Sequence, residues 1–170
     1  MDSVVKIEDV TDWNISETAF DHPDSAAILR EYMTEVASRY WGRPATSAEI
    51  ETALAMPPTD DILAAPTGAF LLGRIDGVPA GCVGIRIPAP GLTELTRMYV
   101  RPAHRGTGGG PLLVAAAEET ARRLGSKLMR LDTRADLVEA RALYARTGYA
   151  EVTPFNADTY AEHWFAKPLT

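Results

Sequence analysis

The sequence predicts an α/β fold in which a mixed β-sheet carries helices on both of its faces. Three observations lead to this prediction. β-rich runs fill the middle of the chain, a glycine-rich turn follows them and opens a helix, and a further strand, helix and strands complete the chain. Strands followed by a strand–helix–strand–helix unit and then more strands are typical of such a layered sheet.

The N-terminal third is expected to hold a short strand, a polar connection and two helices. The strand is expected at residues 4–7, the polar connection at 11–21 and the helices at 26–40 and 47–55. Apolar residues recur at helical spacing in the first helix, with charged residues between them, so one helix face should pack on a core. Asp24 or Ser25 is the expected cap of the first helix. Thr46 or Ser47, followed by Glu49, resembles a capping signal for the second.

The remainder of the chain is expected to alternate between strands and helices. After a loop at 57–66, the expected strands are 69–75, 78–87, 92–100, 128–133, 149–153 and 163–167, and the expected helices are 111–124 and 137–147. Asp76-Gly77 is the dipeptide most typical of a tight hairpin turn, so the strands that flank it should pair antiparallel. Gly125 and Gly148 are expected to end the two helices.

The composition is that of one globular domain, which we expect to span residues 1–170. A chain of 170 residues that is 46% hydrophobic can bury one substantial core but is short for two. It has no uninterrupted apolar run of membrane-spanning length, and its first residues lack the pattern of a secretory signal. We therefore expect a soluble, cytoplasmic protein with no membrane partner. A net charge of −6 opposes nonspecific binding to nucleic acid.

The single cysteine, Cys82, has neither a second thiol to pair with nor a His/Cys cluster for zinc. Free cysteine is among the most buried residue types, so Cys82 is expected to be a buried structural thiol. His22 and His163 have neither a paired nucleophile nor metal-ligand spacing, and both are expected to be structural. We therefore expect no metal site.

The most informative segment is the turn at residues 106–110, where four of the five residues are glycine. Glycine lets the backbone approach a ligand closely, and the N–H groups and dipole at a helix N-terminus attract anions, so this turn could cradle a pyrophosphate. A Walker A loop is excluded because Pro111-Leu112 follows the last glycine. A dinucleotide-binding GxGxxG is excluded because Pro111 or Leu113 stands where it needs glycine. A plain flexible turn remains the alternative.

Two longer segments carry a family resemblance. Residues 94–110 read ELTRMYVRPAHRGTGGG, and residues 139–149 read EARALYARTGY. The first resembles the central motif of the GNAT superfamily of N-acetyltransferases, whose spaced Arg, Gly and Gly are matched by Arg105, Gly108 and Gly110. The second resembles the family's later helix, in which Ala-x-x-Leu-Tyr precedes a Gly-aromatic step.

The resemblance covers about residues 69–169 and implies a mostly antiparallel mixed sheet of about seven strands. The fourth and fifth strands of this fold splay apart, and acetyl-CoA or a close relative binds there as co-substrate without a metal. The implied cofactor-binding residues are Met98, Tyr99, Val100, Arg105, Gly106, Thr107, Gly108, Gly109 and Gly110. The first three would offer a strand edge to the pantetheine arm, and the others would offer backbone N–H groups to the pyrophosphate. The Arg105 side chain would add positive charge.

Two positions depart from the family pattern. Pro111 has no N–H where many relatives have a further donor, so one phosphate contact lacks a counterpart here. Leu137 stands where many relatives carry an Asn that faces the cofactor. Asp136, next to it, is expected only to cap the following helix.

Acetyl transfer requires a neutral amine, a stabilised oxyanion and a proton for the departing thiolate. The resemblance places Tyr144 at the family's proton-donating tyrosine, and a core tyrosine is the alternative. Glu94 is the candidate general base, and an ion pair with Arg97 or another cation is its alternative. Backbone N–H groups of residues 98–100 would polarise the thioester carbonyl. His104 lies beside the phosphate turn and is not expected to be catalytic.

The resemblance therefore implies an acetyl-CoA-dependent N-acetyltransferase that moves an acetyl group directly to a primary amine. The alternatives are a catalytically silent acyl-CoA-binding sensor or structural module, and a turn that binds another phosphate ligand such as a nucleotide. No spacing rule identifies the acceptor, a small molecule or a peptide, although Tyr32, Tyr40 and Trp41 could line its pocket or simply belong to the core. Relatives are often dimers, so a homodimer is compatible with the resemblance.

Overall fold

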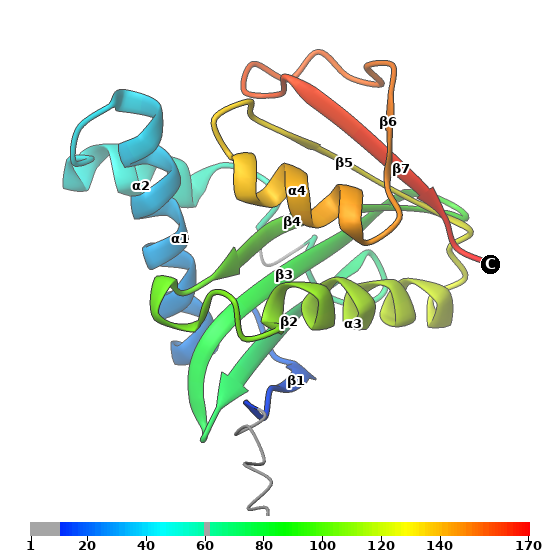
Figure 1. The fold of residues 1–170 in the computed structure, drawn as a ribbon, viewed down its shortest axis with the longest axis horizontal. Helices are drawn as coiled ribbons and strands as arrows, with labels where there is room; N and C mark the ends of the chain where they lie inside the picture. Colours follow the sequence, from blue (N-terminus) through cyan, green and yellow to red (C-terminus); the bar gives the residue numbers. More distant parts are fainter. Residues whose placement is uncertain (1–10, 60–61) are drawn as a thin grey trace, which may run out of the picture.

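The computed structural model describes residues 11–59 and 62–170, which form helices around one seven-stranded sheet (Figure 1). The strands are β1 (Asn14–Glu17), β2 (Gly68–Ile75), β3 (Val78–Ala89), β4 (Leu92–Val100), β5 (Leu128–Thr133), β6 (Ala150–Val152) and β7 (His163–Pro168). The helices are α1 (Pro23–Trp41), α2 (Ser47–Ala55), α3 (Gly109–Arg123) and α4 (Val138–Arg146), with the short 3-10 helix η1 (Pro102–His104). None of the helices in these ranges is long and apolar enough to cross a membrane.

The sheet has the strand order β1-β2-β3-β4-β5-β7-β6. All neighbouring strands are antiparallel except β4 and β5, which are parallel. Asp76 and Gly77 join β2 to β3 and have φ angles of 50° and 78°, as a two-residue hairpin turn requires. The predicted hairpin and the predicted mixed, mostly antiparallel sheet are confirmed.

Side-chain alternation along the strands divides the core between the two faces of the sheet. Leu71 and Ile85 pack with residues of α3 and α4, whereas Phe70 and Cys82 pack with residues of α1. Helices thus cover both faces, as predicted (Figure 1). The Cys82 side chain is fully buried, and this burial raises the pKa of its thiol. The predicted buried structural thiol is confirmed.

The first strand differs from the expectation. The strand expected at residues 4–7 lies outside the described residues. β1 instead lies inside residues 11–21, which were expected to be a polar connection, and it pairs with the outer edge of β2. An edge strand needs only backbone hydrogen bonds on one side, so its sequence need not alternate between apolar and polar residues.

The caps of the first two helices follow from their local sequences. α1 is capped by His22, whose Nδ1 accepts a hydrogen bond from the Asp24 N–H at 3.0 Å. The cap precedes the expected Asp24 or Ser25 because Pro23 occupies the first helical position, where its missing N–H does no harm. Thr46, one of the two expected candidates, caps α2 in a complete capping box.

β4 separates from β5 partway along its length. Arg97 and Met98 of β4 together stand opposite Val83 of β3, so β4 carries one extra residue, a β-bulge. β4 pairs with β5 only over residues 92–94. Within the described chain, residues 95–100 have no partner strand on the β5 side. The predicted splaying of the fourth and fifth strands is therefore confirmed.

Candidate active site

A cleft of about 1230 Å³ opens where β4 and β5 diverge. Its walls come from α1, α2, β4, the glycine turn, β5, α4 and the segment before β7. Of the predicted cofactor-binding residues, all except Thr107 line this cleft, and so do Glu94 and Tyr144. The aromatic residues expected at an acceptor pocket also line it: Tyr32, Tyr40 and Trp41.

The glycine turn presents backbone donors to the cleft. Gly108 has a φ of 90° and is the N-cap of α3, which begins at Gly109, two residues before the expected start. In residues 11–59 and 62–170, no protein group accepts a hydrogen bond from the N–H groups of residues 106–110. These donors sit at the positive end of the α3 dipole, which suits an anion. Pro111 removes one donor from the first turn of α3.

The indole of Trp13 forms the floor beneath the glycine turn. Its Nε1 donates a hydrogen bond to Thr107 Oγ1 at 3.0 Å, and the Thr107 hydroxyl donates to the His104 carbonyl at 2.6 Å. A Cβ added at Gly109 would lie only 2.0 Å from the indole ring. Glycine is thus required at position 109 by close packing. Trp13 was not among the residues predicted from the sequence, although a lone tryptophan in a polar stretch indicates a packing role.

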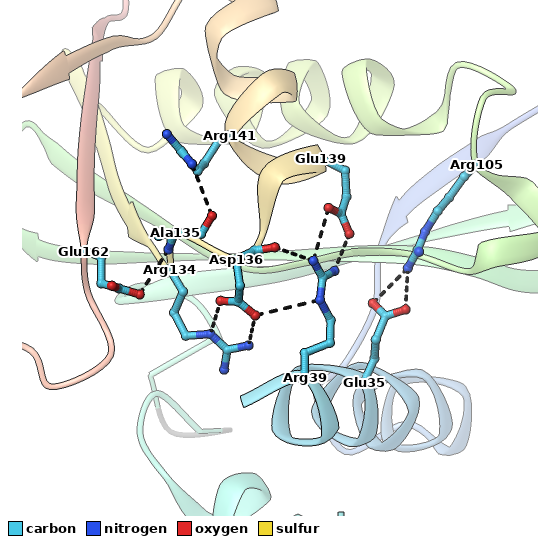
Figure 2. Close-up of polar contacts among 9 residues, drawn as sticks. All are labelled: Glu35, Arg39, Arg105, Arg134, Ala135, Asp136, Glu139, Arg141 and Glu162. Carbon is cyan, nitrogen blue, oxygen red and sulfur yellow. Dashed lines mark hydrogen bonds and ion pairs between the residues drawn. The ribbon is translucent and has the colours of Figure 1, made fainter. Parts of the chain in front are cut away.

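The Arg105 side chain is engaged by its neighbours in β4 and α1. Its Nε donates to the Val100 carbonyl at 2.9 Å, and its Nη2 lies 2.9 Å from each carboxylate oxygen of Glu35 (Figure 2). The expectation that Arg105 adds positive charge to a pyrophosphate stays a prediction. A phosphate that binds the Arg105 guanidinium would have to compete with the Glu35 carboxylate.

A second set of ion pairs ties α1 to α4 beside the cleft. Figure 2 shows Arg39 of α1 reaching the carboxylate of Glu139 and the carbonyl of Asp136 at the start of α4. Arg134, which follows β5, contacts the Asp136 carboxylate at 2.8 and 2.9 Å. Asp136 therefore does not cap α4 as expected. The N-cap is Leu137, which makes no side-chain capping bond.

Glu94 lies at the centre of a row of charges that crosses three strands. Arg86 of β3 and Arg130 of β5 stand directly opposite it in the sheet register. Arg86 donates to one carboxylate oxygen at 3.1 and 2.8 Å, and Arg130 donates to the other at 3.3 and 2.9 Å. These N–H groups occupy about four lone-pair sites, the capacity of a carboxylate, so little remains to accept a proton from an amine. The ion-pair alternative is thus present, but without Arg97.

Asp132 offers a freer carboxylate in the same cleft. Its Oδ2 accepts a hydrogen bond from the Asn156 amide at 2.8 Å, and no other side-chain bond to it occurs in the described part of the chain. Burial raises the pKa of the Asp132 carboxyl above its ordinary 3.8, and the nearby carboxylates of Asp158 and Glu94 raise it further. A partly desolvated carboxylate with a raised pKa is a candidate general base.

Three charged residues of the site were not predicted from the sequence: Arg86, Arg130 and Asp132. A signal for the last two was present, because they alternate with buried Met129 and Leu131 along β5. Such alternation places both polar side chains on the face of the sheet opposite α3. The sequence around Arg86 gives no comparable signal, because its partner Glu94 is evident only from the register of β3 and β4.

Tyr144 belongs to the core and to the cleft at once. Its ring packs against Tyr149 and Phe165, with centroids 6.0 Å apart in each case. Its hydroxyl has no hydrogen-bond partner among the described residues, and Tyr144 is one of the residues that line the cleft. Burial raises the pKa of the Tyr144 phenol above 10.0, which keeps the phenol protonated at neutral pH.

The three histidines have separate surroundings. His104 lines the cleft and packs edge-on against Trp13. His22 caps α1, and the Nδ1 of His163 lies 2.5 Å from the Glu151 carboxylate. Across residues 11–59 and 62–170, no group of three or more potential metal ligands comes together.

Comparison with known proteins assigns this chain to a family. The sequence model of the acetyltransferase (GNAT) family matches residues 26–149. The chain belongs to the GNAT family. Over 148 residues this GNAT enzyme is 32% identical to an uncharacterized N-acetyltransferase of Schizosaccharomyces pombe, and the alignment covers 84% of this chain and 86% of that protein.

Solved structures share the fold of the GNAT enzyme. A GNAT acetyltransferase from Staphylococcus aureus has a TM-score of 0.73 at 16% identity, covering 94% of this chain and 100% of its own. The PaiA N-acetyltransferase of Thermoplasma acidophilum, solved with coenzyme A, has a TM-score of 0.71 at 18% identity, covering 92% and 99%. The family membership makes this protein an acyltransferase that uses an acyl-CoA donor.

Replacing Gly109 with alanine should weaken CoA binding about tenfold or more. The added methyl group would displace the Trp13 indole and with it the turn that carries the free N–H groups, and overpacking of this kind typically costs about 1–3 kcal/mol. Calorimetric titration with CoA measures the loss. Gly110→Ala is the matched control, because its Cβ would meet only the Leu143 side chain, at 3.3 Å. Equal losses in the two variants would contradict the role given to Trp13.

Proposed function

We propose that the GNAT enzyme transfers an acetyl group from acetyl-CoA directly to a primary amine within a ternary complex. One observation carries the proposal: a single cleft joins the free N–H groups of the glycine turn, the unpaired edge of β4 and the carboxylate of Asp132. Groups suited to the donor and groups suited to an amine thus line the same space. Direct transfer requires that the two reactants be held together in one site, which this cleft allows.

The donor is held mainly by backbone groups in this proposal. The exposed edge at residues 98–100 pairs with the pantetheine arm as an added strand would. The N–H groups of residues 106–110 hold the pyrophosphate. Backbone N–H groups beside the bulge polarise the thioester carbonyl and stabilise the oxyanion that develops there. No metal is assigned a role.

The chemical step uses two side chains that line the cleft, Asp132 of β5 and Tyr144 of α4. The neutral amine attacks the thioester carbonyl carbon, the C–N bond forms, and the C–S bond breaks. The surplus proton of the amine nitrogen passes to Asp132, directly or through water, and the thiolate takes the proton of Tyr144. Asp132 suits the base role better than Glu94, because its lone pairs are less occupied. Glu94 instead holds Arg86 and Arg130 in place.

The proposal is tested by titrating the protein with acetyl-CoA in a calorimeter and by measuring CoA thiol release with a panel of primary amines. We expect binding together with release that depends on an amine. Binding without release would favour the silent acyl-CoA sensor. Failure to bind acetyl-CoA, with a nucleotide binding instead, would favour the reading in which the glycine turn holds another phosphate ligand.

Tyr144→Phe should lower kcat by about 100-fold or more while leaving CoA affinity nearly unchanged, because it removes a proton donor and keeps the ring. Steady-state thiol release and calorimetry measure the two quantities. Tyr149→Phe is the matched control: this tyrosine belongs to the same cluster, but its hydroxyl contacts the Met129 sulfur at 3.1 Å rather than the cleft. An unchanged kcat in Tyr144→Phe would remove Tyr144 from its role.

Asp132→Asn should lower kcat by about 100-fold or more at neutral pH. In the parent enzyme, kcat/KM should rise with pH through the pKa of Asp132, so the acidic limb should lie above pH 3.8. The Asp132→Asn variant should lose that limb. Glu94→Gln provides the opposing test, since loss of the acidic limb in that variant, with its retention in Asp132→Asn, would return the base role to Glu94.

A further inference from the structure

We propose that the acceptor is an amine that also carries a carboxylate, as a free amino acid does, and that Arg97 binds this carboxylate. This inference rests on the proposed N-acetyltransferase function and narrows its acceptor class.

Most of the cleft arginines already have a carboxylate partner within the protein. The paired arginines are Arg39, Arg86, Arg105 and Arg134. Arg146 lies exposed on α4. Arg97 differs from the ion-paired arginines and from the exposed Arg146. It is partly buried and, within residues 11–59 and 62–170, has no carboxylate at ion-pair distance.

The guanidinium of Arg97 is positioned by neutral groups. Its Nη2 donates to the carbonyls of Met56 and Pro58 at 3.0 and 3.3 Å, in the segment that follows α2. Its Nε and Nη1 have no hydrogen-bond partner among the described residues, and Arg97 is one of the residues that line the cleft. One edge of a rigid, planar donor group is therefore held in place while other N–H groups stay free.

A free guanidinium edge of this kind matches a carboxylate. Arginine donors fit the two oxygens of a carboxylate in a bidentate geometry, and they lose little side-chain entropy when the group is already held. Burial lowers the pKa of Arg97, which reflects a positive charge that is incompletely compensated. An anionic ligand would supply the missing charge.

Asp132 supplies the complementary negative charge in the same cleft. Arg97 and Asp132 both line the cleft, one on β4 and the other on β5, beyond the point where these strands stop pairing. An acceptor that carries an ammonium and a carboxylate can satisfy both, with its amine at the proposed base.

Two other acceptor classes fit this arrangement less well. The N-terminus of a peptide presents a neutral amide where an amino acid has its carboxylate, and a simple alkylamine presents nothing. Either would leave the Arg97 charge without an anion in a partly desolvated site, and unpaired polar groups of a binding site discriminate strongly against ligands that fail to match them.

The test compares amino acids with their carboxamides, pair by pair, as acceptors in the CoA thiol-release assay. Removing the carboxylate charge makes the amine less basic and leaves more of it neutral, so intrinsic reactivity favours the carboxamide. We expect the parent enzyme nevertheless to favour the amino acid of the accepted pair by about 10- to 100-fold in kcat/KM, the range typical of a hydrogen-bonded charge.

Arg97→Gln should abolish this preference, so that the ratio of the two kcat/KM values falls to about one, because the KM for the amino acid rises. The carboxamide should keep its kcat/KM within about threefold, since glutamine retains N–H donors for the loop carbonyls. Arg97→Lys should preserve part of the preference because it keeps the charge. Arg122→Gln, on α3 and outside the cleft, is the control and should behave as the parent does.

Equal use of the two members of every pair by the parent enzyme, or an undiminished preference in Arg97→Gln, would overturn the inference and leave the acetyltransferase proposal standing. Acetyl-CoA binding without acetylation of any amine in either series would instead overturn the proposed function, and the inference would fall with it.

Discussion

The extra residue in β4 is the constraint on which the rest of the site depends. Without it, β4 would continue beside β5 and its backbone groups would be used within the sheet. With it, β4 turns away, and residues 95–100 keep an unpaired edge. Arg97 has a φ of 54° at this bulge, a conformation that costs a non-glycine residue about 1 kcal/mol or more. The Cys82 thiol, which donates to the Arg97 carbonyl at 3.3 Å, helps to hold it.

The parts of the fold that could be predicted from the sequence are those specified by local chemistry. The Asp76-Gly77 turn requires positive φ at both positions, and Gly106 and Gly108 of the glycine turn also adopt positive φ, which glycine permits. The capping box at Thr46 is likewise a local pattern. β1 could not be predicted in the same way, because an edge strand is specified by the partner that it pairs with.

The sequence predicted the backbone groups of the candidate site and some of its side chains, but not the partners of those side chains. The strand edge and the N–H groups of the turn follow from chain direction and glycine content, so the predicted cofactor segment lines the cleft. The charged side chains depend on distant partners. Glu94 meets Arg86 and Arg130 through a three-strand register, and Arg105 meets Glu35 of α1, neither of which any sequence spacing reveals. Asp132 alternates with buried Met129 and Leu131 along β5, but its place in the cleft beside Asn156 became evident only in the assembled sheet.

The position of Trp13 bears on how the protein can be divided. The family match begins at residue 26, so the indole that supports the glycine turn lies upstream of the residues that the family model matches. A recombinant fragment trimmed to those residues would retain every glycine of the turn and lose the surface against which the turn is shaped. For this acyltransferase, the functional unit therefore begins earlier along the chain than the family alignment indicates.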